Sequence, residues 1–104
     1  MRLVTFERTA EHLLSDEEQA SLDHLLADRP DAGSIVRGAG GIRKLRVRST
    51  GRGKRGGARV IYFYHGAKER VYLILAYSKS VKDDLSGREK QQFRKLTTQL
   101  EAEP

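Results

Sequence analysis

The chain of 104 residues contains no cysteine, so it can form neither a disulfide framework nor a thiolate metal site. It also has no apolar run close to the roughly 20 residues that a membrane-spanning helix needs. The first residues, Met1 to Glu7, lack the long apolar segment and the cleavage site of a signal peptide. No His, Asp and Glu residues cluster with metal-ligand spacing. We therefore expect a cytoplasmic protein with no membrane partner, no metal and no other cofactor.

Acidic residues are missing from the middle of the chain. Residues 1–31 hold three Lys/Arg and eight Asp/Glu, residues 32–68 hold ten Lys/Arg and no acid, and residues 69–104 hold seven and six. A block of one sign attracts a counter-charge, and phosphate is the usual one. Because the block falls on strand-like sequence, it predicts a basic surface that binds a polyanion. A solvated basic face that serves only solubility is the alternative.

The length suits one domain with one modest core, and we find no repeat or linker, so residues 1–104 are expected to form a single domain. Two capping boxes, Ser15 with Glu18 and Ser86 with Glu89, predict helix starts. Alternating or apolar segments predict strands. The expected order is a strand at 2–6, a helix at 7–14, a helix from Ser15 to near Asp28, a loop at 33–41, strands at 42–48, 58–64 and 71–77, and a last helix after Ser86.

The three consecutive strands are joined by connections too short for crossovers, so they should be antiparallel. The last of them, residues 71–77, is almost wholly apolar, as expected of a central strand covered on both faces. The fold class is therefore α+β, a compact antiparallel sheet flanked by two N-terminal helices and a C-terminal helix. In the strand at 42–48, Leu45 and Val47 should face the core, and Lys44, Arg46 and Arg48 the opposite side.

Gly51, Gly53 and Gly56 have the G-x-G-x-x-G spacing of a dinucleotide-binding loop. That site needs a helix after the glycines and an acid about 20 residues further on. Here the glycines lie between two predicted strands, and the acid-free stretch continues to Lys68, so this cofactor is excluded. Two interpretations stay open: a flexible hairpin tip, or a segment that lets its cations follow an RNA backbone, namely Arg52, Lys54 and Arg55.

Other side chains offer little chemistry. The histidines are scattered at positions 12, 24 and 65, and both serines with a clear context are helix caps. Asp83 and Asp84 are adjacent and do not converge on a substrate; we expect them to be solvated or to pair with Lys79 and Lys82. Most tyrosines should belong to the core, but Tyr77 ends the apolar strand beside basic residues, where an aromatic face could stack on an unpaired RNA base.

Two segments carry a family resemblance: GAGGIRKLRVRSTGRGKRGGARVIYFY, and VYLILAYSKSVKDDLSGREK further along. Together they resemble the RelE/HigB superfamily of bacterial toxins, and specifically its HigB-like branch. The resemblance implies an antiparallel sheet with flanking helices that enters the ribosomal A site and cuts mRNA there. It also implies a cognate antitoxin partner, in this branch a helix-turn-helix protein of the HigA type.

By position, the resemblance implies that Arg59 contacts the scissile phosphate. Lys44 and Arg46 match the basic pair on the preceding strand, Lys79 the lysine after the apolar strand, and Lys82 a further basic position. These five residues are the candidate catalytic set, and the candidate RNA contacts are Arg43, Arg48, Arg52, Lys54, Arg55 and Tyr77. Several relatives have a tyrosine or histidine near the C-terminal helix as a catalytic group, and this chain has neither there, so the general acid stays unassigned.

The chemistry implied is attack by the RNA 2′-OH on the adjacent phosphate, without a metal. A lysine among other cations gives up its proton more readily, which makes Lys44 or Lys79 the candidate base. Two other functions stay open: a toxin of the same fold that inhibits another target, as the ParE-like gyrase inhibitors do, and a basic RNA- or ribosome-binding module without catalysis.

Overall fold

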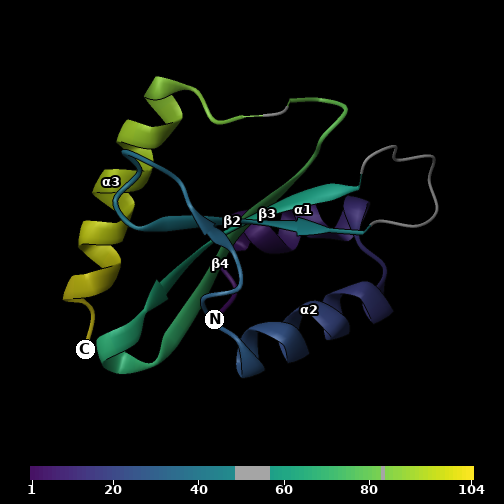
Figure 1. Ribbon diagram of the computed structural model, residues 1–104, viewed down its shortest axis with the longest axis horizontal. Coiled ribbons are helices and arrows are strands. Elements are labelled where there is room, and N and C mark those ends of the chain that lie inside the picture. The colour runs from purple at the N-terminus through teal and green to yellow at the C-terminus, as the bar shows by residue number, and fades with distance from the viewer. Residues whose placement is uncertain (49–56, 83) are drawn as a thin grey trace.

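The computed structural model describes residues 1–48, 57–82 and 84–104, which form three α-helices and a four-stranded sheet (Figure 1). The predicted α+β class, with two N-terminal helices and one C-terminal helix, is confirmed. No helix of the described residues is long and apolar enough to cross a membrane. The elements are α1 (Val4–Leu13), α2 (Asp16–Asp28), β1 (Ser34–Ile35), β2 (Ile42–Val47), β3 (Ala58–His65), the 3-10 turn η1 (Gly66–Lys68), β4 (Arg70–Ser78) and α3 (Gly87–Ala102).

The sheet has the order β1-β2-β3-β4, and every pair in it is antiparallel, as predicted for the three long strands. Its two faces carry separate cores. On one face, α1 and α2 contribute Phe6, Ala10 and Leu22 to a cluster with β3 and β4. On the other face, Phe93 and Leu100 of α3 join a second cluster. The sheet is thus the middle layer, with α1 and α2 on one face and α3 on the other (Figure 1).

Both predicted capping boxes are present. The Ser15 hydroxyl accepts from the Glu18 amide at 3.1 Å, and the Glu18 carboxylate accepts from the Ser15 amide at 2.9 Å. The same reciprocal pair, with the same two distances, joins Ser86 and Glu89 at the start of α3. These bonds satisfy amides that have no partner inside the helix, which fixes where α2 and α3 begin.

The predicted strand at residues 2–6 is wrong, because α1 begins at Val4. Phe6 and Ala10, four positions apart, are both fully buried, while Val4 is 70% exposed, so the pattern has a helical period. Only the residues before Val4 are extended. There the Leu73 amide donates to the Met1 carbonyl at 2.8 Å, and the Leu3 amide to the Leu73 carbonyl at 2.9 Å.

The strand order corrects the predicted central position of the apolar strand. β4 is covered on both faces, yet it lies at the end of the sheet and not in its centre. Its outer edge is paired with the N-terminal residues through a parallel bridge between Arg2 and Leu73. The predicted loop at 33–41 also contains β1, which pairs Ser34 with Lys44 and Ile35 with Arg43.

The glycine-rich loop after β1 lies against α3. Gly40 has a φ of +72°, and a Cβ there would be 2.5 Å from Thr97 Oγ1 and 2.9 Å from Arg94 Cα. The Arg94 guanidinium donates to the carbonyl of Gly38. Only a residue without a side chain permits this approach, so the glycine motif places the start of β2 relative to α3.

Tyr62 connects β3 to the segment before β1. Its hydroxyl donates to the Pro30 carbonyl at 2.8 Å and accepts from the Gly33 amide at 2.8 Å. Burial raises the pKa of this phenol, since the charged form would lose its water. The neutral hydroxyl therefore joins β3 to the segment before β1 through two hydrogen bonds.

Candidate functional site

A row of side chains crosses the sheet near the end of β2, the start of β3 and the end of β4. Arg46 of β2 is directly opposite Arg59 of β3, and Arg59 is directly opposite Tyr77 of β4. Directly opposed residues point to the same face of a sheet. Lys44 lies two positions before Arg46 and therefore shares that face. Three predicted site residues and one predicted stacking residue are thus neighbours.

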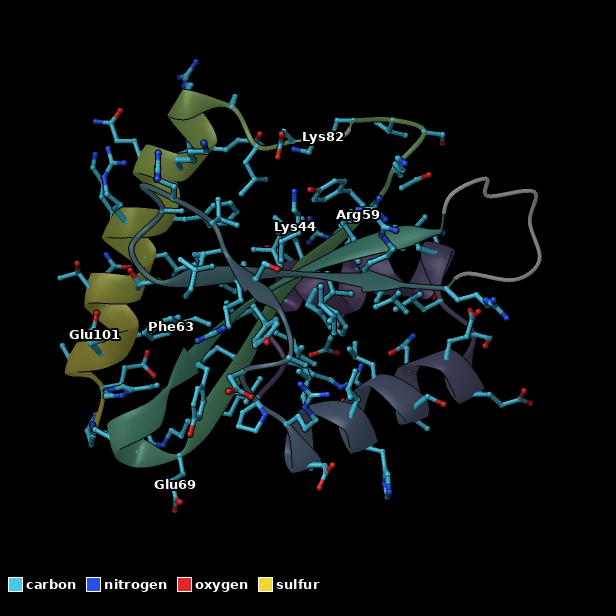
Figure 2. The ribbon with its side chains drawn as sticks, in the orientation of Figure 1. Lys44, Arg59, Phe63, Glu69, Lys82 and Glu101 are labelled. Carbon is cyan, nitrogen blue, oxygen red and sulfur yellow. The ribbon has the colours of Figure 1, made fainter. Side chains whose placement is uncertain are left out.

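This face is the one that carries α3. Tyr77 belongs to the cluster that includes Phe93 of α3, and Figure 2 shows Lys44, Arg59 and Lys82 on the same part of the molecule, where β4 leads toward α3. We call Lys44, Arg46, Arg59 and Lys82 the cationic face. Its members come from β2, β3 and the segment after β4 and lie up to 38 positions apart, so only the fold brings them together.

A β-bulge in β4 determines which way Tyr77 points. Ile61 is opposite Leu75 while Tyr62 is opposite Leu73, so Ile74 is an extra residue without a partner on β3. Leu73 and Ala76 consequently face the α1 side, whereas Ile74 and Tyr77 face the α3 side. Regular alternation from Leu73 would have put Tyr77 on the α1 side. The bulge therefore directs Tyr77 to the cationic face.

Arg59 is only 4% exposed although it is charged. Its Nη1 donates to the carbonyl of Ala58 at 3.3 Å. Arg46, opposite to it, is exposed. A guanidinium carries five N–H donors in a rigid fork, which suits phosphate oxygens. The structure therefore places one buried and one solvent-accessible arginine side by side.

Lys82 is held by two groups. Its ammonium lies 5.0 Å from the centre of the Tyr77 ring and forms an ion pair with the Glu89 carboxylate. The hydrogen bond from Lys82, together with that from the Ser86 amide, holds the pKa of Glu89 below its usual range. Glu89 is also the residue that caps α3, so one carboxylate both starts the helix and orients Lys82.

Lys44 has a different partner. Its Nζ lies 3.0 Å from Oδ1 of Asp84, forty positions away in sequence. The hydrogen bond from Lys44 lowers the pKa of the Asp84 carboxyl. We expected this aspartate to be solvated or to pair with Lys79 or Lys82; its side chain is 81% exposed, and its ion-pair partner is Lys44 instead. The Lys44 ammonium is therefore already bound to a carboxylate in the free protein.

The other predicted residues are distributed differently. Lys79 is exposed in the turn after β4, where its amide donates to the Gly57 carbonyl at 3.3 Å. Arg48 is exposed at the end of β2. Arg43 lies on the opposite face from Lys44 and donates to the Gly33 carbonyl at 2.7 Å, so the structure does not bring it to the cationic face. Arg52, Lys54, Arg55 and Asp83 lie outside the described residues.

Sequence reasoning missed the roles of two carboxylates, Asp84 toward Lys44 and Glu89 toward Lys82. Glu89 was recognised as a cap, and no sequence signal pointed to its second role. Tyr77 was predicted to stack on a base, but it is only 7% exposed and has the Lys82 ammonium over its ring. Within the described residues, no three His, Asp or Glu side chains are grouped as a metal site.

An antiparallel sheet between three helices, with arginines and lysines gathered on one face, defines a small α+β protein with a positively charged surface. A family model described as the RelE toxin of the RelE/RelB toxin–antitoxin system matches residues 3–103. The chain therefore belongs to the RelE toxin family. The predicted superfamily is confirmed, whereas its HigB-like branch stays a prediction. A toxin of such a system has a cognate antitoxin as its partner.

Proposed function

We propose that this toxin is a ribosome-dependent endoribonuclease that cuts mRNA in the A site and so stops translation. The observation that carries the proposal is the convergence of Arg46, Arg59, Lys44 and Lys82 on one sheet face in a chain of the RelE family. Four cations on one face can hold a phosphodiester and the charge that develops on it during cleavage. The antitoxin we propose is the helix-turn-helix protein implied by the HigB-like resemblance.

The reaction uses the RNA's own nucleophile. The 2′-oxygen loses its proton and forms a bond to the adjacent phosphorus, the bond from phosphorus to the 5′-oxygen breaks, and that oxygen takes up a proton. The products are a 2′,3′-cyclic phosphate and a 5′-hydroxyl end. We assign Arg59 to the phosphorane, because a guanidinium fork can donate two hydrogen bonds to phosphate oxygens without losing its charge. Arg46, opposite to it, contacts the neighbouring phosphate oxygens.

Of the two lysines considered as general base, Lys79 fits better than Lys44. Lys44 already donates to the Asp84 carboxylate, so its ammonium has a partner in the free protein. Lys79 forms no ion pair with any described carboxylate. It is exposed in the free protein, so the loss of water that would help it release a proton has to come from the ribosome. This requirement is consistent with an enzyme that acts only in the A site.

Tyr77 has a different role in this proposal from the predicted one. Because its ring is buried under the Lys82 ammonium, it supports a cation and does not offer a free face to a base. We assign Lys82 to the phosphate on the far side of the cleaved bond from Arg46, held there by Tyr77 and Glu89. Arg48 is assigned to the RNA backbone at the open end of β2.

The test is cleavage of mRNA by purified protein on programmed ribosomes, with the new 5′ ends mapped by primer extension. Arg59→Ala should lower the cleavage rate by at least about 100-fold, the usual effect of removing one transition-state donor. Arg8→Ala, which removes the same charge from the exposed side of α1, is the matched control. Circular dichroism checks that both variants fold.

Three results would contradict the proposal. Equal cleavage by the two variants would remove Arg59 from the mechanism. Ribosome binding without any cut in the mRNA would favour the non-catalytic module. Inhibition of DNA gyrase by the wild-type protein, with mRNA left whole, would favour the ParE-like alternative.

A further inference from the structure

Both lysines of the cationic face, Lys44 and Lys82, are bound to a carboxylate, but the two carboxylates are held very differently. Glu89 accepts from the Ser86 amide as well as from Lys82, and it is the N3 residue of α3, so it is fixed by the helix. The Asp84 side chain is 81% exposed, and among the described residues only Lys44 donates a hydrogen bond to its carboxylate.

The Asp84 carboxylate occupies a place that suits a phosphate oxygen. Lys44 Nζ is 3.0 Å from Oδ1 of Asp84, the distance at which an ammonium also binds phosphate. Lys44 shares its sheet face with Arg46 and Arg59, the two arginines assigned to the scissile linkage. An anion bound to Arg46 and Arg59 therefore lies on the same sheet face as Lys44, where Oδ1 of Asp84 now accepts the lysine's hydrogen bond.

An exposed ion pair of this kind is weak, because water and salt screen it and because two flexible side chains must be held in one geometry. RNA can therefore displace Asp84, but it must break this ion pair before Lys44 can bind a phosphate. Free RNA therefore gains little affinity from Lys44 while Asp84 is bound to it. RNA binding comes mainly from counter-ions that the RNA releases when protein cations neutralise its phosphates, and Lys44 is already neutralised by Asp84.

We propose that Asp84 is an internal competitor for the phosphate at Lys44, and that it makes the toxin discriminate against free RNA in favour of mRNA held in the ribosome. The inference rests on the proposed function in one respect, that Lys44 contacts RNA. The ribosome fixes the mRNA phosphates beside the protein, so the exchange of Asp84 for phosphate occurs at a high effective concentration. Free RNA lacks this advantage.

The experiment measures binding of a fluorescein-labelled oligouridylate by anisotropy, over a series of salt concentrations. Asp84→Asn removes the carboxylate and keeps the size of the side chain. The matched control is Asp23→Asn, which makes the same change in an exposed ion pair with Arg2, 2.7 Å long, on the α2 side of the molecule. Both variants raise the net charge by one, so any difference between them reports the position of the carboxylate.

Asp84→Asn should bind the oligonucleotide several-fold more tightly than Asp23→Asn. Its plot of log K against log salt should be steeper by about 0.7, the value for one more phosphate contact on a single strand. In a Lys44→Gln background this difference should disappear. Binding to mRNA-programmed ribosomes, measured by pelleting, should increase less than binding to the free oligonucleotide.

The outcomes separate the two proposals. If Lys44→Gln weakens RNA binding but Asp84→Asn and Asp23→Asn behave alike, Asp84 is not a competitor and this inference fails, while the proposed function stands. If Lys44→Gln has no effect on RNA binding or cleavage, or if Asp84→Asn binds no free RNA at low salt, this inference fails. The proposed function fails only if the wild-type protein leaves mRNA on programmed ribosomes uncut. If Asp84→Asn increases the affinity for free RNA and for programmed ribosomes by the same factor, Asp84 does not make the toxin discriminate between them.

Discussion

The glycine-rich loop before β2 permits a prediction that separates a structural role of glycine from a role in RNA binding. Gly38 and Gly40 both have positive φ angles, +78° and +72°. A Cβ on Gly38 would meet only the end of the Arg94 side chain, at 4.0 Å, whereas one on Gly40 would be 2.5 Å from Thr97 Oγ1 and 2.9 Å from Arg94 Cα. Alanine at the two positions should therefore have unequal effects.

The expected magnitudes follow from these contacts. Alanine in the left-handed region costs about 1–2 kcal/mol, and this cost applies to both variants. Overpacking adds about 1–3 kcal/mol at Gly40 only, because the nearest atoms include the backbone of α3, which cannot rotate away. Gly40→Ala should thus be less stable than Gly38→Ala by about 1–3 kcal/mol. For a domain of this size each kcal/mol lowers the melting temperature by roughly 4–8 °C.

Urea unfolding, followed by circular dichroism, measures the difference as a shift in midpoint at constant slope. The cleavage rate on programmed ribosomes, at a temperature where both variants are folded, should stay within about twofold of wild type, since neither glycine is on the cationic face. Equal midpoints for the two variants would refute the reasoning about the loop and α3. A large loss of cleavage in stable Gly38→Ala would show that the loop takes part in RNA binding.

Three further predictions test the cationic face and its support. Arg59→Lys keeps the charge but loses the fork, so mRNA cleavage should fall by about 100-fold, and near-normal cleavage would show that charge alone suffices. Glu89→Gln keeps the helix cap but loses the charge that faces Lys82. Lys82 holds the pKa of Glu89 in the folded protein below its ordinary value of 4.5. The Glu89 carboxylate therefore contributes its full stabilisation above pH 4.5, and this stabilisation is lost as the pH falls through the lowered pKa of the folded protein. The urea midpoints of wild type and Glu89→Gln should therefore converge in acid, and a constant gap would contradict the pairing. Tyr62→Phe leaves the buried Gly33 amide without its 2.8 Å acceptor and should lower the free energy of unfolding by about 1–3 kcal/mol, whereas an unchanged urea midpoint would contradict this role.

Local signals in the sequence were sufficient for much of the fold. Each capping box involves residues three positions apart, and both helix starts were predicted correctly. The alternation in residues 42–48 correctly put Lys44 and Arg46 on one face of β2. The start of α1 was missed because Leu3, Val4 and Phe6 also fit a strand, and only the burial of Phe6 with Ala10 shows the helical period.

The rest depended on contacts between distant segments. In residues 71–77 nearly every side chain is apolar, so no pattern reveals the bulge at Ile74 or the face that Tyr77 takes. The pair of Lys44 and Asp84 spans forty positions, and a salt bridge between such residues leaves no mark on local composition. Arg59 was expected at the site by resemblance, but its burial beside Arg46 and Tyr77 follows only from strand register.

The shortness of β1 has a consequence for every charge-removing variant of this protein. β1 pairs only with Arg43 and Lys44, so the outer edge of β2 from Leu45 to Val47 has no strand beside it in the described chain. Open edges invite pairing with another molecule, and exposed cations such as Arg46 and Arg48 discourage it. Replacing these arginines by neutral residues should promote self-association, so the oligomeric state must be measured before any lost toxicity is attributed to lost catalysis.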